Sequence, residues 1–387
     1  MNALFIRAKN SQDDFLWGLL EYGVTIQELN TPEFDPNEIH SEEISALSDA
    51  LDVGNYDCVI SFLFLPEVSN LCLEKGVEYI SWTYDSPLVS YYSDALGNPN
   101  NHTFVFDYTE AEELKARGGA NIHHLPLACN LSRVGGLEIT PEDETTFSHD
   151  ISYVGNFYSD NSYNKFFPFL ADDIADELRR EVESRMFAWN APRDWPILSP
   201  KLTEALAKLG TYPCRNMDLA TFIGITFVFR KLAEIERVSM VHTLANYFSV
   251  DVYTRDGSEF LQAGNIHSSV NYYTDMSKIF YLSKINLNLT LPSIRSAVPQ
   301  RVFDVLGCGG FLLTNEQPEL CELFCVGEEI ETFHSLEELV AKIKFYQAHE
   351  DLRLRIAMKG YQAIRERHTY QHRIAKMQQF LREDGLR

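Results

Sequence analysis

The stretch PQRVFDVLGCGGFLLTNEQPEL, residues 299–320, places an amphipathic helix, a glycine turn and an apolar strand in succession. Pro299 suits the first turn of a helix because the N–H that proline lacks would be unpaired there. Val302 and Leu306 would then lie on the apolar face of this helix, and Gly309 suits the left-handed conformation that ends it. The stretch therefore predicts a helix followed at once by a buried strand.

Two charged residues, Arg301 and Asp304, share one face of this helix near its N-terminus. The helix follows the apolar strand KINLNLTLP. In open α/β sheets, a helix that begins where a strand ends commonly binds phosphate groups. Arg301 would add a bidentate cation there, and Asp304 could accept hydrogen bonds from ribose hydroxyls. The alternative is that the two side chains pair with each other or with surface neighbours.

Short β-rich runs alternate with helical patterns along most of the chain, which is typical of parallel α/β layers. Residues 132–149 lose this periodicity and gain Gly, Pro and acidic residues, which marks a linker. We therefore expect an α/β fold with one domain over residues 1–140 and a second over 150–365. The second domain would include a helical insertion at 160–248, and a C-terminal helix would follow at 366–387.

Composition and charge restrict the partners of the protein. The 387 residues carry 33 Lys and Arg against 56 Asp and Glu, a formal charge of −23, so nucleic acid and anionic membrane surfaces are poor partners. The seven cysteines form no C-x-x-C pair, as expected of reduced thiols in the cytoplasm. No apolar run reaches the ~18 residues of a transmembrane helix, and the opening MNALFIRAKN lacks the apolar core of a signal peptide.

Several well-known chemical motifs do not occur in the sequence. It has no G-x-x-x-x-G-K-[ST], no G-x-G-x-x-G and no H-E-x-x-H, so a P-loop NTPase, a typical dinucleotide oxidoreductase and a zincin are unsupported. It also has no D-x-D string that could hold a metal-bridged diphosphate. We therefore expect no metal cofactor, and protein cations would stabilise the charge of any leaving diphosphate.

Several segments resemble the CgeB-type glycosyltransferases, which are relatives of the group 1 glycosyltransferases. In the second half these are RVFDVLGCGGFLLTNEQPEL, GEEIETFHSLEELVAKIKFY and RHTYQHR; in the first half they are YISWTYDSP, FVFDYTEAEELKARGG and HHLPLACN, with DISYVGNFY between the halves. The resemblance implies a GT-B fold, in which two Rossmann-like domains face each other across a cleft. It also implies a hexosyltransferase whose C-terminal domain binds a nucleotide sugar, with UDP as the expected nucleotide, and whose N-terminal domain binds an acceptor protein or glycan.

One position departs from the group 1 pattern. Group 1 enzymes carry two glutamates eight positions apart near the donor, and here the second falls on Asp304 while the first falls on Ser296. Ser296 cannot supply a carboxylate to the transferred sugar, so retention of the anomeric configuration does not follow from the resemblance. By position, Arg295 and Ser296 are still expected to contact the sugar or the diphosphate.

Asp85, in WTYDSP, is the candidate catalytic residue of the first domain. It lies just beyond the end of a predicted strand, where open α/β sheets place their ligands. A carboxylate there could take the proton from an acceptor hydroxyl. The alternative is that Asp85 caps the next helix. Asp107 has the same ambiguity, with capping favoured, and His123 and His124 are expected in a loop or the core before a predicted strand, LPLAC.

Four further residues are candidates for donor binding in the second domain. Gly155 and Asn156 end its first predicted strand, where a backbone without a side chain lets a diphosphate approach closely. The alternative for this pair is a simple tight turn. Tyr253 and Thr254 end the predicted strand VDVYT, where a nucleotide base could stack, although a tyrosine at a strand end is more often part of the core packing.

Two other classes of function stay open. The missing first glutamate is compatible with a non-catalytic or coat-associated protein that kept the GT-B scaffold and binds a ligand without turnover. GT-B scaffolds also host nucleotide-sugar epimerases. The sugar, the acceptor and the oligomeric state do not follow from the sequence.

Overall fold

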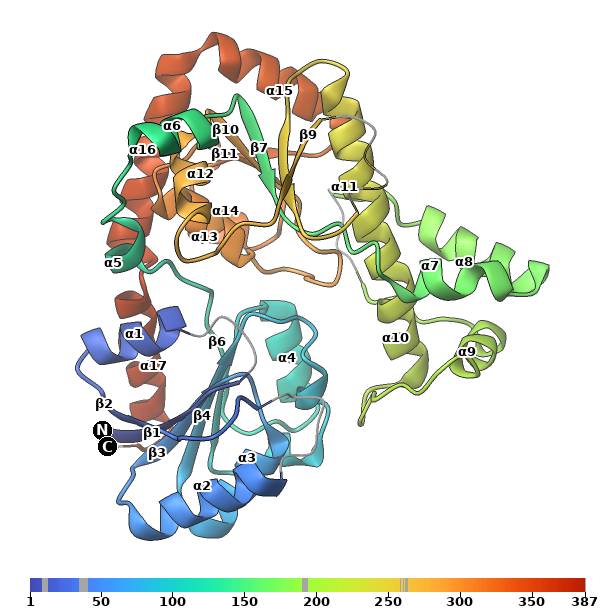
Figure 1. Ribbon diagram of the computed structural model, residues 1–387. Helices are drawn as coiled ribbons and strands as arrows, with labels where there is room; N and C mark the ends of the chain where they lie inside the picture. The colour runs from blue at the N-terminus through green and yellow to red at the C-terminus, as the bar shows by residue number, and fades with distance from the viewer. Residues whose placement is uncertain are drawn as a thin grey trace. The chain divides into compact units, whose positions relative to one another are not determined.

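The computed structural model describes residues 1–8, 13–34, 41–189, 194–257, 259, 261 and 264–386. The chain forms two compact units. The first contains residues 1–130, 213–217 and 368–387, and the second contains residues 131–212 and 218–367. Each unit is built on one parallel six-stranded sheet with helices packed around it (Figure 1). The α/β class predicted from the alternating pattern is therefore confirmed.

The sheet of the first unit has the strand order β2-β1-β3-β4-β5-β6. Its strands are β1 (Asn2–Ile6), β2 (Thr25–Glu28), β3 (Cys58–Phe62), β4 (Glu78–Thr83), β5 (Asn101–Val105) and β6 (Ile122–His124). The central strands β3, β4 and β5 are buried almost throughout, as expected of parallel strands covered on both faces. The helices are α1 (Asp13–Glu21), α2 (Ser41–Val53), α3 (Pro66–Lys75), α4 (Tyr108–Ala116), α17 (Tyr370–Glu383) and the 3₁₀ turns η1 (Val89–Tyr91) and η2 (Asp94–Gly97).

The C-terminal helix α17 packs against α1, and Figure 1 shows the two helices, red and blue, side by side. Gly18 of α1 makes this close approach possible, because a β-carbon at that position would lie only 2.7 Å from the β-carbon of Tyr370. The bridge between Cys129 and Thr369 holds the start of α17 to the segment after β6. The last helix of the chain thus completes the first unit.

The sheet of the second unit has the order β12-β11-β10-β7-β8-β9. Its strands are β7 (Ile151–Val154), β8 (Asp251–Thr254), β9 (Asn265–Ser268), β10 (Ile285–Asn288), β11 (Leu312–Asn315) and β12 (Glu331–Phe333). Its main helices are α6 (Pro141–Phe147), α11 (Arg230–Ala245), α12 (Met276–Leu282), α13 (Gln300–Gly307), α15 (Leu336–Ala348) and α16 (Glu350–Arg367), with short α5 (Leu131–Val134) and α14 (Leu320–Leu323). Apolar side chains of β7, β8 and β10 pack against α11 and α15 to form its core.

A helical insertion separates β7 from β8, as the sequence predicts. It consists of α7 (Ser162–Phe166), η3 (Phe167–Phe169), α8 (Asp172–Glu183), α9 (Pro200–Ala207), α10 (Leu219–Gly224), the π-helical turn η4 (Ile225–Phe229) and α11. Helices α7, α8 and α9 extend from α11 (Figure 1). Residues 190–193 of the predicted insertion lie outside the described residues.

Local predictions around residues 299–320 are confirmed, whereas two elsewhere were wrong. Pro299 is the N-cap of α13, and Gly309 has φ +77°, the left-handed conformation that ends this helix. The non-periodic stretch 132–149 contains α6, which a reciprocal capping box at Thr140 stabilises. The predicted strand LPLAC is instead irregular, and the strand of that region is β6. No helix in the described part of the chain is long and apolar enough to cross a membrane.

Candidate functional site

The carboxyl ends of β10 and β11 form a buried polar edge in the second unit. The side-chain amide of Asn288 donates to the hydroxyl of Thr314 at 2.9 Å, and the amide N–H of Thr290 donates to the side chain of Asn315 at 2.7 Å. Ligands of open α/β sheets bind at the carboxyl ends of the strands. We therefore expect ligand-binding side chains in the segment from Leu289 to Pro299, which leads from β10 to α13.

Arg237 of α11 reaches this edge, and sequence reasoning missed it. Its Nη1 donates to the carbonyl of Asn156 at 2.5 Å and its Nη2 to the carbonyl of Leu289 at 2.9 Å, so it links the ends of β7 and β10. The residue is buried. Within the described residues these acceptors are neutral carbonyls and no carboxylate pairs with it, so its positive charge is available to an anionic ligand. The signal in the sequence was an arginine on the apolar stripe of an amphipathic helix.

The turn after β7 contains the predicted residues Gly155 and Asn156. The Gly155 N–H donates to the carbonyl of Tyr253 at 3.0 Å, which continues the pairing of β7 with β8. Farther along the turn, Tyr158 has φ +59° and lies under the guanidinium of Arg237, 4.9 Å from the ring centre. Arg230 lies 4.5 Å from the same ring centre, so two arginines of α11 meet the turn.

Asp304 of α13 lies in a buried polar network. Its Oδ1 accepts hydrogen bonds from the Tyr272 hydroxyl at 3.0 Å and from Gln300 Nε2 at 2.9 Å. The guanidinium of Arg133 is 3.9 Å from the same oxygen and donates to the Tyr272 hydroxyl at 3.1 Å. Asp304 is thus held in one orientation by partners from three different segments of the chain.

Arg301 points away from Asp304, toward α12. Its guanidinium contacts the sulfur of Met276 at 2.5 Å and lies 5.1 Å from the ring centre of Phe280. Among the described residues it pairs neither with Asp304 nor with another carboxylate. The alternative of an ion pair between Arg301 and Asp304 is therefore not observed among the described residues.

Ser296 and Arg295 contact partners that are distant in the sequence. The Ser296 hydroxyl donates to Glu319 Oε1 at 2.7 Å, and the Glu319 N–H donates to the Ser296 carbonyl at 3.0 Å. Both residues are buried. The guanidinium of Arg295 lies 3.9 Å from the ring centre of Trp195, whose indole N–H donates to the Ser293 carbonyl at 3.3 Å. The helical insertion therefore supports the segment that precedes α13.

Tyr253 and Thr254 make mainly structural contacts. The Tyr253 hydroxyl is 2.7 Å from His149 Nε2, and its ring stacks on His267 with ring centres 4.5 Å apart. The Thr254 hydroxyl donates to the carbonyl of Asp256 at 2.7 Å. These contacts fit the packing alternative, and a role for either residue in binding the nucleotide base stays a prediction.

In the first unit, Asp85 follows the end of β4 and is half-buried. Its N–H donates to the Thr83 hydroxyl at 3.1 Å. The next helical turn, η1, has Leu88 as its N-cap and no side-chain cap, so Asp85 does not cap it. Asp107 is a cap, because its carboxylate accepts from the Glu110 N–H at 3.1 Å at the start of α4. A catalytic role for Asp85 stays a prediction.

The histidine pair of the first unit is placed differently from the expectation. His123 and His124 belong to β6 itself rather than to a loop before a strand. His123 Nε2 lies 2.7 Å from Asp384 Oδ2, and its ring stacks on Phe380 of the C-terminal helix α17. His124 Nε2 is 3.2 Å from the Phe106 carbonyl. These contacts bind strand and C-terminal segment together and give no indication of catalysis.

Comparison with known protein families gives a match over part of the chain. Residues 230–379 match the glycosyl transferase-like family. That segment includes Arg237, Ser296, Asp304 and Glu319. No curated protein sequence matches the chain.

Several solved structures have a similar fold. Anabaena HepE in complex with UDP and glucose has 7% sequence identity and a TM-score of 0.57, and the match covers 99% of this chain and 100% of that one. Sucrose-phosphate synthase from Thermosynechococcus elongatus has 10% identity and a TM-score of 0.55, with 98% of each chain covered. T4 phage BGT in complex with UDP-glucose has 10% identity and a TM-score of 0.52, with 100% of each chain covered. The chain therefore has the GT-B fold, and its residues 230–379 match the glycosyl transferase-like family.

Proposed function

We propose that this protein is a metal-independent GT-B glycosyltransferase that moves a hexose from a UDP-sugar to a hydroxyl of an acceptor protein or glycan. The observation that carries the proposal is the match of residues 230–379 to the glycosyl transferase-like family, because this segment supplies the polar groups near the carboxyl edge of the second sheet. Two similar structures, those of HepE and T4 phage BGT, are complexes with UDP-glucose. We further propose that the protein belongs to the CgeB-type enzymes within the group 1 relatives.

The second unit would bind the donor. Arg237 and Arg301 would stabilise the diphosphate, assisted by the positive end of the α13 helix dipole. Asp304 would accept hydrogen bonds from the ribose, since a carboxylate can accept about four hydrogen bonds in all. Gly155 and Asn156 would let the donor approach the backbone at the end of β7. Charge that develops on the leaving diphosphate would then meet preorganised cations, without a metal ion.

The transferred sugar would be held by the segment before α13. Ser296 stands where group 1 enzymes have a glutamate, but its hydroxyl is hydrogen-bonded to the carboxylate of Glu319. We propose that Glu319 supplies the carboxylate that Ser296 lacks, with Ser296 fixing its orientation. Arg295, which the Trp195 ring supports from one side, would contact the sugar or the diphosphate.

The first unit would bind the acceptor. Asp85 would accept the proton of the acceptor hydroxyl as that oxygen attacks the anomeric carbon, while the bond from that carbon to the diphosphate breaks. In a retaining enzyme the leaving diphosphate could take this proton, and Asp85 would then matter less. All seven cysteines are free thiols, which supports a reducing, cytoplasmic location.

Donor turnover distinguishes the proposed function from the two alternatives. The protein is incubated with UDP-glucose or another nucleotide sugar, with and without candidate acceptors, and free UDP and sugar products are quantified. A glycosyltransferase releases UDP, slowly by hydrolysis without acceptor and faster with one. A protein that only binds would show a thermal shift with the nucleotide sugar and no release of UDP, and an epimerase would produce the epimeric sugar.

A further inference from the structure

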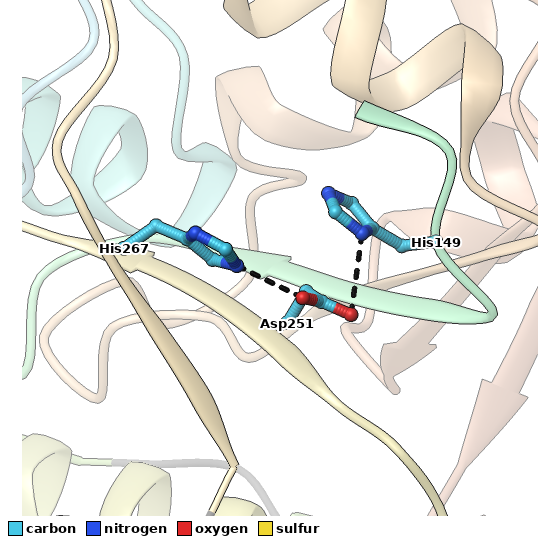
Figure 2. Close-up of side chains that lie close together, drawn as sticks. All are labelled: His149, Asp251 and His267. Atoms are coloured by element: carbon cyan, nitrogen blue, oxygen red, sulfur yellow. Dashed lines mark hydrogen bonds and ion pairs between the residues drawn. The ribbon is translucent and has the colours of Figure 1, made fainter. Parts of the chain in front are cut away.

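Two histidines and an aspartate converge in the second unit, near the amino-terminal ends of β7 and β8. The proposed donor site lies at the opposite, carboxyl ends of the strands. His149 Nδ1 is 3.2 Å from Asp251 Oδ2, and His267 Nε2 is 2.8 Å from Asp251 Oδ1. The three ligating atoms all lie within 4.8 Å of one another. Figure 2 shows both imidazole rings turned toward the carboxylate.

Three strands of the sheet position these side chains. His149 precedes β7, Asp251 is the first residue of β8, and His267 lies on the edge strand β9. In the pairing of β8 with β9, Tyr253 is opposite His267, so Asp251 and His267 are diagonal neighbours on one face. The sheet fixes the backbones of Asp251 and His267, and His149, in the short segment between α6 and β7, is held by a hydrogen bond from the Lys284 N–H to its carbonyl at 2.9 Å.

The surroundings also resemble those of metal ligands. His149 Nε2 is 2.7 Å from the Tyr253 hydroxyl, and a metal-bound histidine usually donates its second N–H to such a partner. The Tyr253 ring stacks on His267 at an interplanar angle of 17° and so fixes that imidazole too. The side chains of His149 and Asp251 are only 9% and 10% exposed, whereas that of His267 is 36% exposed, which leaves one side open to water.

The distances between the imidazole nitrogens and the Asp251 oxygens are similar to those between two ligand atoms of a zinc ion. Zn²⁺ binds imidazole nitrogen and carboxylate oxygen at about 2.0–2.2 Å, so two ligand atoms of a tetrahedral site are about 3.3 Å apart. The 3.2 Å and 2.8 Å separations are close to this value, but they join the two imidazoles to different oxygens of Asp251, so the carboxylate would turn to bring one oxygen to the ion. Without a metal the same contacts are hydrogen bonds between imidazole N–H groups and the carboxylate. A change of tautomer in each neutral ring would turn the nitrogens into ligands without releasing a proton, and His149 would then donate its Nε2–H to Tyr253.

We propose that His149, Asp251 and His267 form a zinc site, with water as the fourth ligand on the exposed side of His267. Two nitrogens and one oxygen suit Zn²⁺ better than Mg²⁺ or Ca²⁺, which prefer sets of oxygen ligands. The ion would tie the edge strand β9 to β8 and to the start of β7. The four residues of β7, roughly 13 Å at ~3.3 Å per residue, separate the site from the donor edge. It is therefore independent of the proposed transferase activity.

Calorimetric titration of the full chain with ZnCl₂, after dialysis against a chelator, tests the proposal. The exposed thiols of Cys321 and Cys325 could bind zinc separately, so every protein in the comparison carries Cys321→Ser and Cys325→Ser. We expect one Zn²⁺ per chain, a melting temperature raised by the metal, and no saturable binding of Mg²⁺ or Ca²⁺ in the same range. Absence of stoichiometric zinc binding, or equal binding of Mg²⁺ or Ca²⁺, would overturn the assignment.

Two variants and a matched control locate the metal. His267→Ala removes one ligand and should weaken zinc binding at least tenfold. His334→Ala is the control, because His334 of the same unit is also exposed and also paired with a carboxylate, at 2.9 Å from Glu316, and it should bind zinc like the parent. Should His267→Ala not fold, Tyr253→Phe removes only the hydroxyl beside His149 and should weaken binding by about 10–100-fold. If His267→Ala binds zinc as tightly as the parent protein, the proposed site is refuted. If His267→Ala does not fold, unchanged zinc affinity of Tyr253→Phe refutes it instead.

Discussion

The Ser296 hydroxyl donates a hydrogen bond to the carboxylate of Glu319 over 2.7 Å, although the two residues are 23 positions apart. A second hydrogen bond, from the Glu319 N–H to the Ser296 carbonyl, joins the same segments. A buried carboxylate therefore stands beside the position at which group 1 enzymes have a glutamate. We propose that this carboxylate, which comes from beyond the next strand, compensates in space for the position that departs from the family pattern.

Replacing the Glu319 carboxylate tests its role in holding the sugar. Glu319→Gln keeps the size and the contact with Ser296 but removes the charge, so the affinity for UDP should persist. Loss of one charge-assisted contact, worth about 1.5–3 kcal/mol, should lower kcat/KM for transfer by roughly one to two decades. Ser296→Ala leaves the carboxylate in place and should have a smaller effect. Equal kcat/KM for Glu319→Gln and wild type would contradict the role of Glu319.

Arg237 should contribute to donor affinity because its guanidinium is buried at the ends of β7 and β10 without a carboxylate partner among the described residues. Arg237→Lys keeps a charge but cannot reach both carbonyls in the same way, and we expect UDP to bind about tenfold or more weakly by calorimetry. Arg179→Lys, on the exposed side of α8, is a control for the general effect of replacing an arginine with lysine. If both variants bind UDP like wild type, Arg237 does not contact the donor.

Arg301→Ala tests the first turn of α13. Since Arg301 pairs with no carboxylate among the described residues and contacts Met276 and Phe280, its removal should leave the melting temperature nearly unchanged. The affinity for UDP should fall by roughly one to two decades, the effect of about 1.5–3 kcal/mol. A thermal-shift titration with UDP measures both quantities, and an unchanged midpoint concentration would remove Arg301 from the donor site.

Asp85→Asn separates a catalytic from a structural role in the first unit. Asparagine keeps the shape and much of the hydrogen bonding of Asp85, which does not cap η1, so folding and donor affinity should be preserved. Transfer to the true acceptor should fall by about 10²–10⁴, the usual contribution of a positioned general base. Asp107→Asn is the matched comparison, since asparagine caps a helix almost as well as aspartate and transfer should be preserved. Transfer near the wild-type rate by Asp85→Asn would exclude a catalytic role.

Transfer should not require a divalent metal. With excess chelator, the initial rate of UDP release in the presence of acceptor should stay close to that of untreated enzyme, measured at a temperature well below the melting transition. The proposed zinc site predicts a lower melting temperature under the same conditions, so the two measurements are made together. Loss of the rate at constant folding, with recovery on adding Mn²⁺ or Mg²⁺, would show that metal takes part in transfer.

The sequence alone determined the elements whose signals are local. Alternating apolar periods predicted the parallel α/β class, Pro299 and Gly309 predicted both ends of α13, and Asp107 was expected as a cap. Each of these features depends on backbone conformation and hydrogen bonds within a few neighbouring residues, and residue type controls such interactions directly. The resemblance that predicted the GT-B fold likewise consists of short continuous segments in both halves of the chain, residues 301–320 among them.

Only the tertiary structure decided which side chains meet. Arg237 lies 52 residues before the Leu289 carbonyl that it contacts, and Glu319 reaches Ser296 across a helix and a strand. Similarly, Asp251 meets His149 and His267 because β8 lies between β7 and β9 in the sheet. Strand order and register set these contacts, and both result from packing the whole unit around one core, which no local pattern of residues encodes.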